Sequence, residues 1–139
     1  MRRRMMLIQT TIMIASMLMG ATLVWVPAAS AFEITKVTSP GGIKAWLVED
    51  HKNPIITIKM TFLGGSSADP AGKPGLAYLT SGLLDEGAGD LDSAAFQKAL
   101  ADESIGLSFN ANTDSFSGSL TTLTETSKDA FRLLRLALN

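Results

Sequence analysis

Apolar and polar residues alternate along several stretches of the chain, which is the pattern of a β-strand with one buried face. The clearest alternation covers residues 56–62, where isoleucine, methionine and phenylalanine are separated by threonine and lysine. Residues 107–111 and 116–122 repeat the pattern on either side of a Thr-Asp turn. Residues 33–37 and 43–48 flank a Ser-Pro-Gly-Gly turn, so they predict a β-hairpin.

A different spacing predicts helices. Residues 64–75 are rich in glycine, proline and serine and form a loop, after which residues 76–84 predict a short helix that ends before a Gly-Ala-Gly stretch. Asp92 and Thr126 stand where caps of two further helices are expected. The apolar sides of these helices are formed by Phe96, Ala99 and Leu100 in the first and by Phe131, Leu134 and Leu138 in the second.

The order of these elements predicts an α+β fold, with a mostly antiparallel sheet and helices on one side of it. The chain shows no internal repeat. It stops at Asn139 inside the last predicted helix, without a capping glycine or a closing strand. We therefore expect residues 32–139 to be the N-terminal part of a longer lobe.

The first 31 residues have the composition of an export signal. Three arginines follow Met1, a long stretch without charge runs to Val26, and a small-x-small pattern ends at Ala31, where we expect cleavage. The uncharged stretch approaches the ~20 residues that span a bilayer, so an uncleaved membrane anchor is the alternative. Either outcome exports the remaining chain, and we expect a periplasmic location.

Charge and cysteine content exclude some classes of function. Without residues 1–31 the chain keeps 9 basic and 13 acidic side chains, and its lysines are scattered. No basic stripe is present, so we expect no nucleic-acid partner. The chain of 139 residues contains no cysteine, so disulfides do not stabilise it.

Four segments, taken together and in this order, resemble the insulinase/pitrilysin family of metallopeptidases. They are residues 42–50, residues 64–77, the pair Ile105-Gly106, and the Phe-Asn-Ala-Asn-Thr sequence of residues 109–113. In that family Gly-Leu-Ala is followed by the motif H-x-x-E-H, in which two histidines bind zinc and the glutamate activates water. Here Gly-Leu-Ala is followed by Tyr78, Ser81 and Gly82 at the three motif positions.

A tyrosine, a serine and a glycine do not replace two imidazoles and a carboxylate, so we expect no zinc and no catalytic residue in this lobe. The chain is therefore similar to the non-catalytic members of the family. The resemblance implies that zinc is held by a homologous partner subunit, and that the two subunits enclose a chamber for an extended peptide. The third zinc ligand of the family, a glutamate, falls beyond Asn139.

Other interpretations of these residues are weaker. Tyr78 is expected to pack with its hydroxyl hydrogen-bonded, and Ser81 has no base near it in sequence, which argues against a serine nucleophile. Glu49, Asp50 and His51 are consecutive and precede Asn-Pro, as in a solvated turn, and do not predict a metal site.

One segment is a positive candidate for binding. The resemblance places Phe109, Asn110, Ala111 and Asn112 on a strand along which substrate peptide adds by backbone hydrogen bonds. An ordinary strand of the sheet is the alternative. Two other functions also stay open: a free-standing peptide-binding or scaffold protein, and a metalloendopeptidase whose active lobe follows residue 139.

Overall fold

The computed structural model describes residues 32–139, and the predicted leader lies outside this range. The chain divides into two compact units, one ending at Glu49 and the other running Asp50–Asn139. In the first unit β1 (Ile34–Thr38) pairs antiparallel with β2 (Lys44–Val48). The Ser39 hydroxyl oxygen accepts a hydrogen bond from the Ile43 backbone N–H (3.0 Å) across the turn. The predicted hairpin is thus confirmed.

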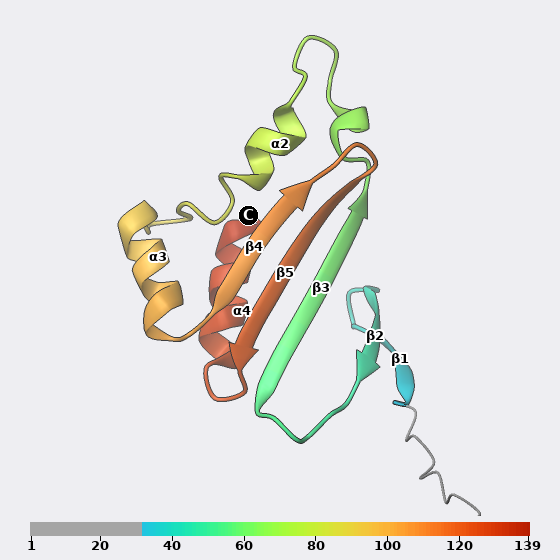
Figure 1. Cartoon of the computed structure of the whole chain (residues 1–139), viewed down its shortest axis with the longest axis vertical. Coiled ribbons are helices and arrows are strands. Elements are labelled where there is room, and N and C mark those ends of the chain that lie inside the picture. The colour runs from blue at the N-terminus through green and yellow to red at the C-terminus, as the bar shows by residue number, and fades with distance from the viewer. Residues whose placement is uncertain (1–31) are drawn as a thin grey trace, which may run out of the picture. The chain divides into compact units, whose positions relative to one another are not determined.

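The second unit contains the remaining strands and helices (Figure 1). Its elements are, in order, β3 (Ile55–Leu63), the short 3-10 helix η1 (Ser66–Ala68), α2 (Leu76–Ser81), α3 (Ser93–Asp102), β4 (Gly106–Ala111), β5 (Ser115–Leu123) and α4 (Ser127–Ala137). The three strands form an antiparallel sheet in the order β3-β5-β4. The α+β class is confirmed, although the strands divide into a two-stranded and a three-stranded sheet.

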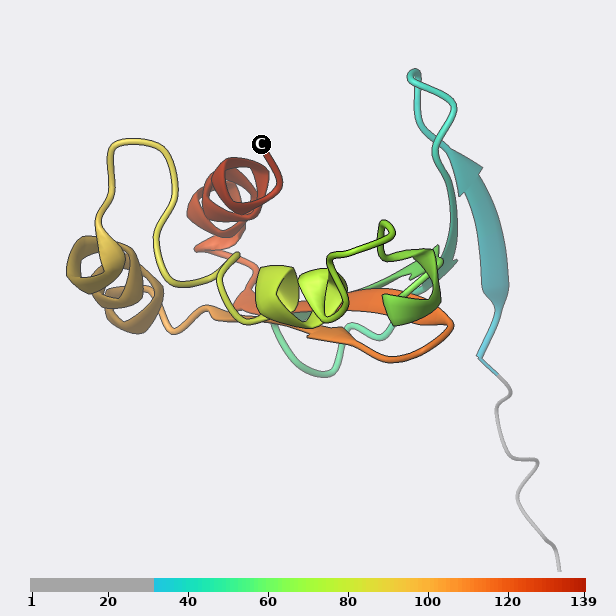
Figure 2. The same ribbon diagram turned by 90° about the horizontal axis from the view of Figure 1, so that it is seen from above.

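The alternation in sequence separates the two faces of the three-stranded sheet. Ile58, Leu120 and Leu107 lie opposite one another on neighbouring strands and face the helices, where Phe96 of α3 and Leu133 of α4 are fully buried. Figure 2 shows α4 lying across this face. The other face, which we call the open face, presents mainly serine and threonine. The helices therefore cover one face only, as predicted.

The cap and the buried side of α4 differ from the prediction. Thr126 occupies the N-cap position, but its hydroxyl bonds the Thr122 hydroxyl (2.8 Å) instead of a helix N–H. The buried side of the helix is formed by Ala130, Leu133, Leu134 and Ala137. Phe131 is 47% exposed and Leu138 is 44% exposed, so of the three residues predicted to face the core only Leu134 does so. By contrast, the predicted Asp92 cap of α3 is confirmed: its carboxylate accepts from the Ala95 N–H at 2.8 Å.

Helix α2 was predicted over residues 76–84 but ends at Ser81. Gly82 is its C-cap, and a Cβ at this position would have no atom closer than 3.8 Å. The glycine is therefore not required by close packing. Asp69 in the preceding loop binds the other end of the helix: one carboxylate oxygen accepts from Gly75 N–H (2.7 Å) and the other from Ala77 N–H (2.9 Å). Sequence inspection missed this cap because Asp69 lies six residues before the N-cap.

The loop after β3 is bound to the β4–β5 turn by backbone hydrogen bonds. Gly64 N–H donates to Asp114 O (2.8 Å), and Ser66 N–H donates to Asn112 O (2.8 Å). Between them, Gly65 is buried, and a Cβ there would lie 1.9 Å from Asn112 O. Only glycine permits this approach of two backbones.

We predict that Gly65→Ala destabilises the full chain by about 1–3 kcal/mol or more, because the added methyl group must push the loop off the turn. Gly82→Ala is the matched control. Its backbone is right-handed helical and its surroundings are open, so we expect a gain of about 0.4–1 kcal/mol. Thermal unfolding of both variants measures the difference, and equal melting temperatures would contradict the close approach at Gly65.

We also predict that Asp69→Ala lowers stability by about 0.5–2 kcal/mol, the usual cost of losing a helix cap. Asp69→Asn should recover part of the loss, since an amide oxygen still accepts one N–H. Asp90→Ala, at an exposed turn residue, serves as the control. Urea unfolding of the three variants checks the order; equal effects of Asp69→Ala and Asp90→Ala would exclude the cap.

Candidate functional site

Helix α2 presents the three motif positions in different environments. Tyr78 is 61% exposed, so the expectation that it packs is wrong. Ser81 is buried, and its hydroxyl donates to the backbone oxygen of Tyr78 (2.8 Å). Gly82 caps the helix and carries no side chain. Positions 78, 81 and 82 share one side of a helix, as the zinc motif requires, but the chemistry at that side is different.

The residues at these positions do not fit a zinc ion. Zinc sites in proteins use imidazole, thiolate or carboxylate donors, and none of the three positions supplies one. Across residues 32–139, no group of three or more histidine, aspartate or glutamate side chains is arranged to hold a metal ion. A serine nucleophile is not supported either, because the Ser81 hydroxyl is buried and already donates to the backbone.

The four residues predicted to bind peptide lie on or just after β4, which is an edge strand of the three-stranded sheet. Asn110 is exposed on the open face, whereas Phe109 faces the core, and its ring is tilted by 36° to that of Phe116 at 6.3 Å between centroids. Ala111 is 1% exposed. Asn112 is exposed, but its amide oxygen accepts from the Asp114 and Ser115 N–H groups of the turn.

Of these four residues, Asn110 alone offers an exposed side chain that the turn does not use. The odd-numbered residues of β4 direct their backbone groups away from β5, yet Leu107 and Ala111 are buried and Phe109 is half-buried. Helix α2 packs against this end of β4. Addition of a peptide along β4 therefore requires the packing around Ala111 to open.

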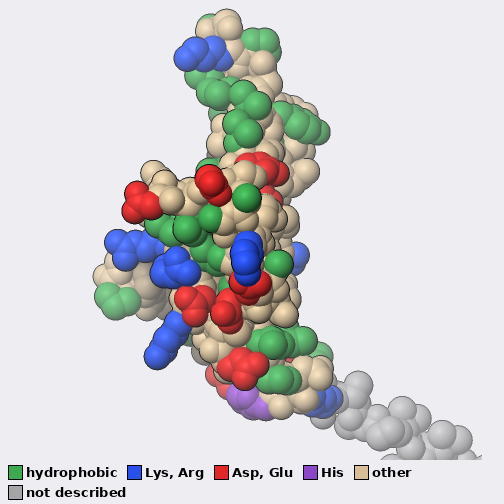
Figure 3. Space-filling model, turned by 90° about the vertical axis from the view of Figure 1, so that its left-hand side faces the viewer, with side chains coloured by type: hydrophobic (Ala, Val, Ile, Leu, Met, Phe, Trp, Pro, Cys, Tyr) green, Lys and Arg blue, Asp and Glu red, His purple; other side chains and the backbone are tan. Residues whose placement is uncertain are grey.

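The surface of α2 and the residues after it is apolar. Leu76, Tyr78, Leu79 and Leu83 are 39–61% exposed, and Figure 3 shows hydrophobic side chains gathered on this part of the surface. No acidic residue lies between Pro70 and Leu84. Exposed apolar side chains gathered in this way are typical of surfaces that contact other polypeptide. The apolar residues at positions 76, 78, 79 and 83 are visible in the sequence, but their exposure depends on how the helix packs.

No helix within residues 32–139 is long and apolar enough to cross a membrane.

Comparison with solved structures relates this fold to known peptidases. A peptidase M16 inactive domain from Pseudomonas fluorescens matches with a TM-score of 0.70 and 25% identity, over 77% of this chain and 26% of that chain. The periplasmic protease PqqL from Escherichia coli matches with a TM-score of 0.66 and 19% identity, over 84% of this chain and 14% of that chain. The chain thus spans about a quarter or less of the length of these proteins.

No family model matches the chain, and no curated protein matches its sequence. The structural likeness nevertheless confirms the predicted insulinase-like lobe, since M16 is the peptidase family of insulinase. The likeness to an inactive domain agrees with the motif positions, which lack zinc ligands and a general base. By its fold and its motif residues, the chain is similar to part of an insulinase-like (M16) peptidase lobe of the inactive kind.

Proposed function

We propose that the protein is a non-catalytic part of an exported insulinase-like zinc peptidase, which shapes the peptide chamber together with a zinc-bearing homologue. The observation that carries this proposal is α2: the resemblance aligns this helix with the zinc helix of the family, and it has tyrosine, serine and glycine where the ligands and base are expected. Zinc in this assembly belongs to the homologue.

The surroundings of α2 support a structural role. Asp69 caps the helix, the loop before it is hydrogen-bonded to the β4–β5 turn, and its C-terminal Ser81 is buried. Each net hydrogen bond of this kind stabilises a fold by about 0.5–1.5 kcal/mol. A helix held in this way keeps its place without doing chemistry, so its exposed apolar side chains can form a wall or a contact surface.

Peptide contact is the second element of the proposal. Strand β4 is an edge of its sheet, and backbone pairing at an edge binds peptides with little demand on their sequence, once the packing around Ala111 has opened. Asn110 is the side chain through which β4 meets peptide on the open face. Ala111 is buried on β4, the strand against which α2 packs.

Export is the third element. The arginine-rich start, the uncharged stretch and the Ala-x-Ala end of the leader support it, and the structurally similar PqqL is a periplasmic protease. The periplasm is therefore the proposed compartment, where the chain meets a homologue exported by the same route.

We predict that the purified full chain binds no stoichiometric zinc, because a tetrahedral site needs three protein ligands and the motif positions supply none. Metal analysis after dialysis against a trace of zinc measures the ratio. One tightly held zinc per chain, lost in a Tyr78→Phe or Ser81→Ala variant, would overturn the non-catalytic assignment.

We further predict that the full chain, co-expressed with an exported homologue from the same organism that retains H-x-x-E-H, co-purifies with it and raises its rate of peptide cleavage. The Gly65→Ala variant, in which the loop before α2 is displaced, is the matched control and should raise the rate less. If the homologue neither binds the chain nor changes its rate, a free-standing scaffold is the better description.

A further inference from the structure

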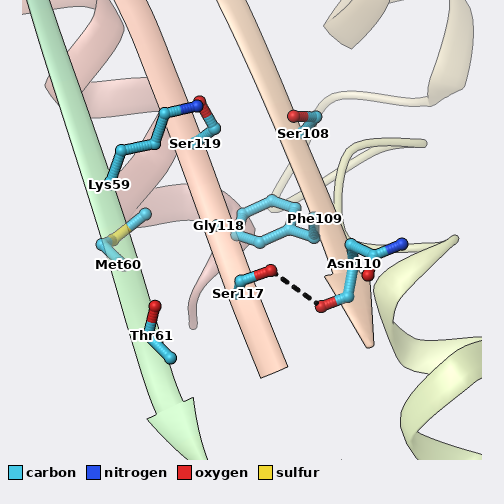
Figure 4. Close-up of a pocket in the computed structure, with 9 residues that line it drawn as sticks. All are labelled: Lys59, Met60, Thr61, Ser108, Phe109, Asn110, Ser117, Gly118 and Ser119. Atoms are coloured by element: carbon cyan, nitrogen blue, oxygen red, sulfur yellow. Dashed lines mark hydrogen bonds between the residues drawn. The ribbon is translucent and has the colours of Figure 1, made fainter. Parts of the chain in front are cut away.

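A shallow pocket lies on the open face of the three-stranded sheet, over its central strand β5 (Figure 4). Its volume is about 150 Å³, and the residues that line it all belong to β3, β4 and β5, so the Asp50–Asn139 unit forms it alone. A pocket of this size admits one functional group of a ligand. The polar side chains that line it are Lys59, Thr61, Ser108, Asn110, Ser117 and Ser119.

The side chain of Lys59 is directed into this pocket. Its ammonium group donates to the Ser119 hydroxyl (2.7 Å) on the neighbouring strand, and the two side chains lie next to each other in Figure 4. An ammonium group has three N–H donors, so two remain for a ligand. Ser119 accepts this bond, so its own hydroxyl proton is available to another acceptor. Ser108 lies opposite Ser119 in the strand register, and its side chain is exposed.

The charge in the pocket has no counter-charge within the described part of the chain. Lys59 is the sole charged residue in β3, β4 and β5. Among residues 32–139 it forms no ion pair, unlike Lys98 and Arg132, which are paired with carboxylates on their own helices. N–H and O–H donors around one positive charge favour an oxyanion, whereas a cation is repelled.

We propose that this pocket binds a carboxylate group, with Lys59 as its counter-ion and the hydroxyls of Ser108 and Ser119 as hydrogen-bond donors. Hydrogen bonds between charged groups of this kind are roughly twice as strong as those between neutral groups. An acidic side chain of a peptide supplies the carboxylate, because Asn110, which the proposed function assigns to peptide contact, lines the same pocket. This source rests on the proposed function, whereas the carboxylate site rests on the pocket itself.

NMR titration of the isotope-labelled full chain tests the site, with acetyl-Ala-Glu-Ala-amide and its glutamine analogue as probes. We expect the glutamate peptide to give saturable shifts of the backbone amides of Ser108, Ser117 and Ser119, and the glutamine peptide to give none. Lys59→Met keeps the apolar stem and loses the ammonium group, so it should weaken binding by about tenfold or more. Lys128→Met removes the same charge from the exposed side of α4 and should change nothing.

A second variant tests the hydroxyls. Ser108→Ala, at an exposed position, should weaken binding of the glutamate peptide by a smaller factor than Lys59→Met. Absence of saturable shifts, equal shifts with the glutamine peptide, or binding that is indifferent to both Lys59→Met and Ser108→Ala would each overturn the site. The titration needs no homologue, so such a result counts against this pocket and leaves the proposed function standing.

Acetate and inorganic phosphate distinguish the sources of the oxyanion. We expect the glutamate peptide to shift the three serine amides at lower concentration than either free ion, because the peptide also contacts the residues around the pocket. Equal or tighter binding of acetate or phosphate would overturn the assignment to a peptide side chain and make a free anion the ligand.

Discussion

The approach of the loop after β3 to the β4–β5 turn is the contact on which the candidate site depends. Gly64 and Ser66 donate to backbone oxygens of the turn, and Gly65 between them has no room for a side chain. These bonds join the end of one edge strand to the end of the other across β5. They also set where the chain leaves the sheet, so Asp69 is placed to cap α2, and α2 is placed beside β4. The position of the degenerate helix is therefore a consequence of backbone geometry.

The two faces of the sheet have separate roles. The helix-covered face contains the core, in which Leu107, Leu120 and the helix residues Phe96 and Leu133 are buried. Gly118 at the middle of β5 lets Met60 and Phe109 meet over the strand, since a Cβ there would lie 2.8 Å from the Met60 Cε. The open face is formed by short hydroxyl side chains and Lys59. The buried apolar side chains of this sheet thus lie on one face.

Loss of catalysis and retention of the scaffold are compatible for a physical reason. Zinc binding and water activation depend on the side chains at positions 78, 81 and 82. Of these, Tyr78 is exposed and Gly82 has no side chain, and the buried Ser81 is accommodated by its hydrogen bond to the Tyr78 backbone oxygen. The helix itself is held by the Asp69 cap and by packing against β4. Substitution of the motif therefore removes the reaction without removing the fold, as the likeness to an inactive M16 domain also indicates.

The sequence by itself determined the class of fold, the order of elements and the missing zinc motif, because alternation, helical spacing and donor chemistry are local properties. Asp92 was recognised as a cap for the same reason. Tertiary structure decided what depends on distant partners: the Thr126 hydroxyl bonds Thr122, Asp69 caps a helix six residues away, and α4 is rotated so that Phe131 is exposed. The tertiary structure also decided that Ala111 is buried and that Lys59 bonds Ser119. Both depend on which strands and helices the fold brings next to each other.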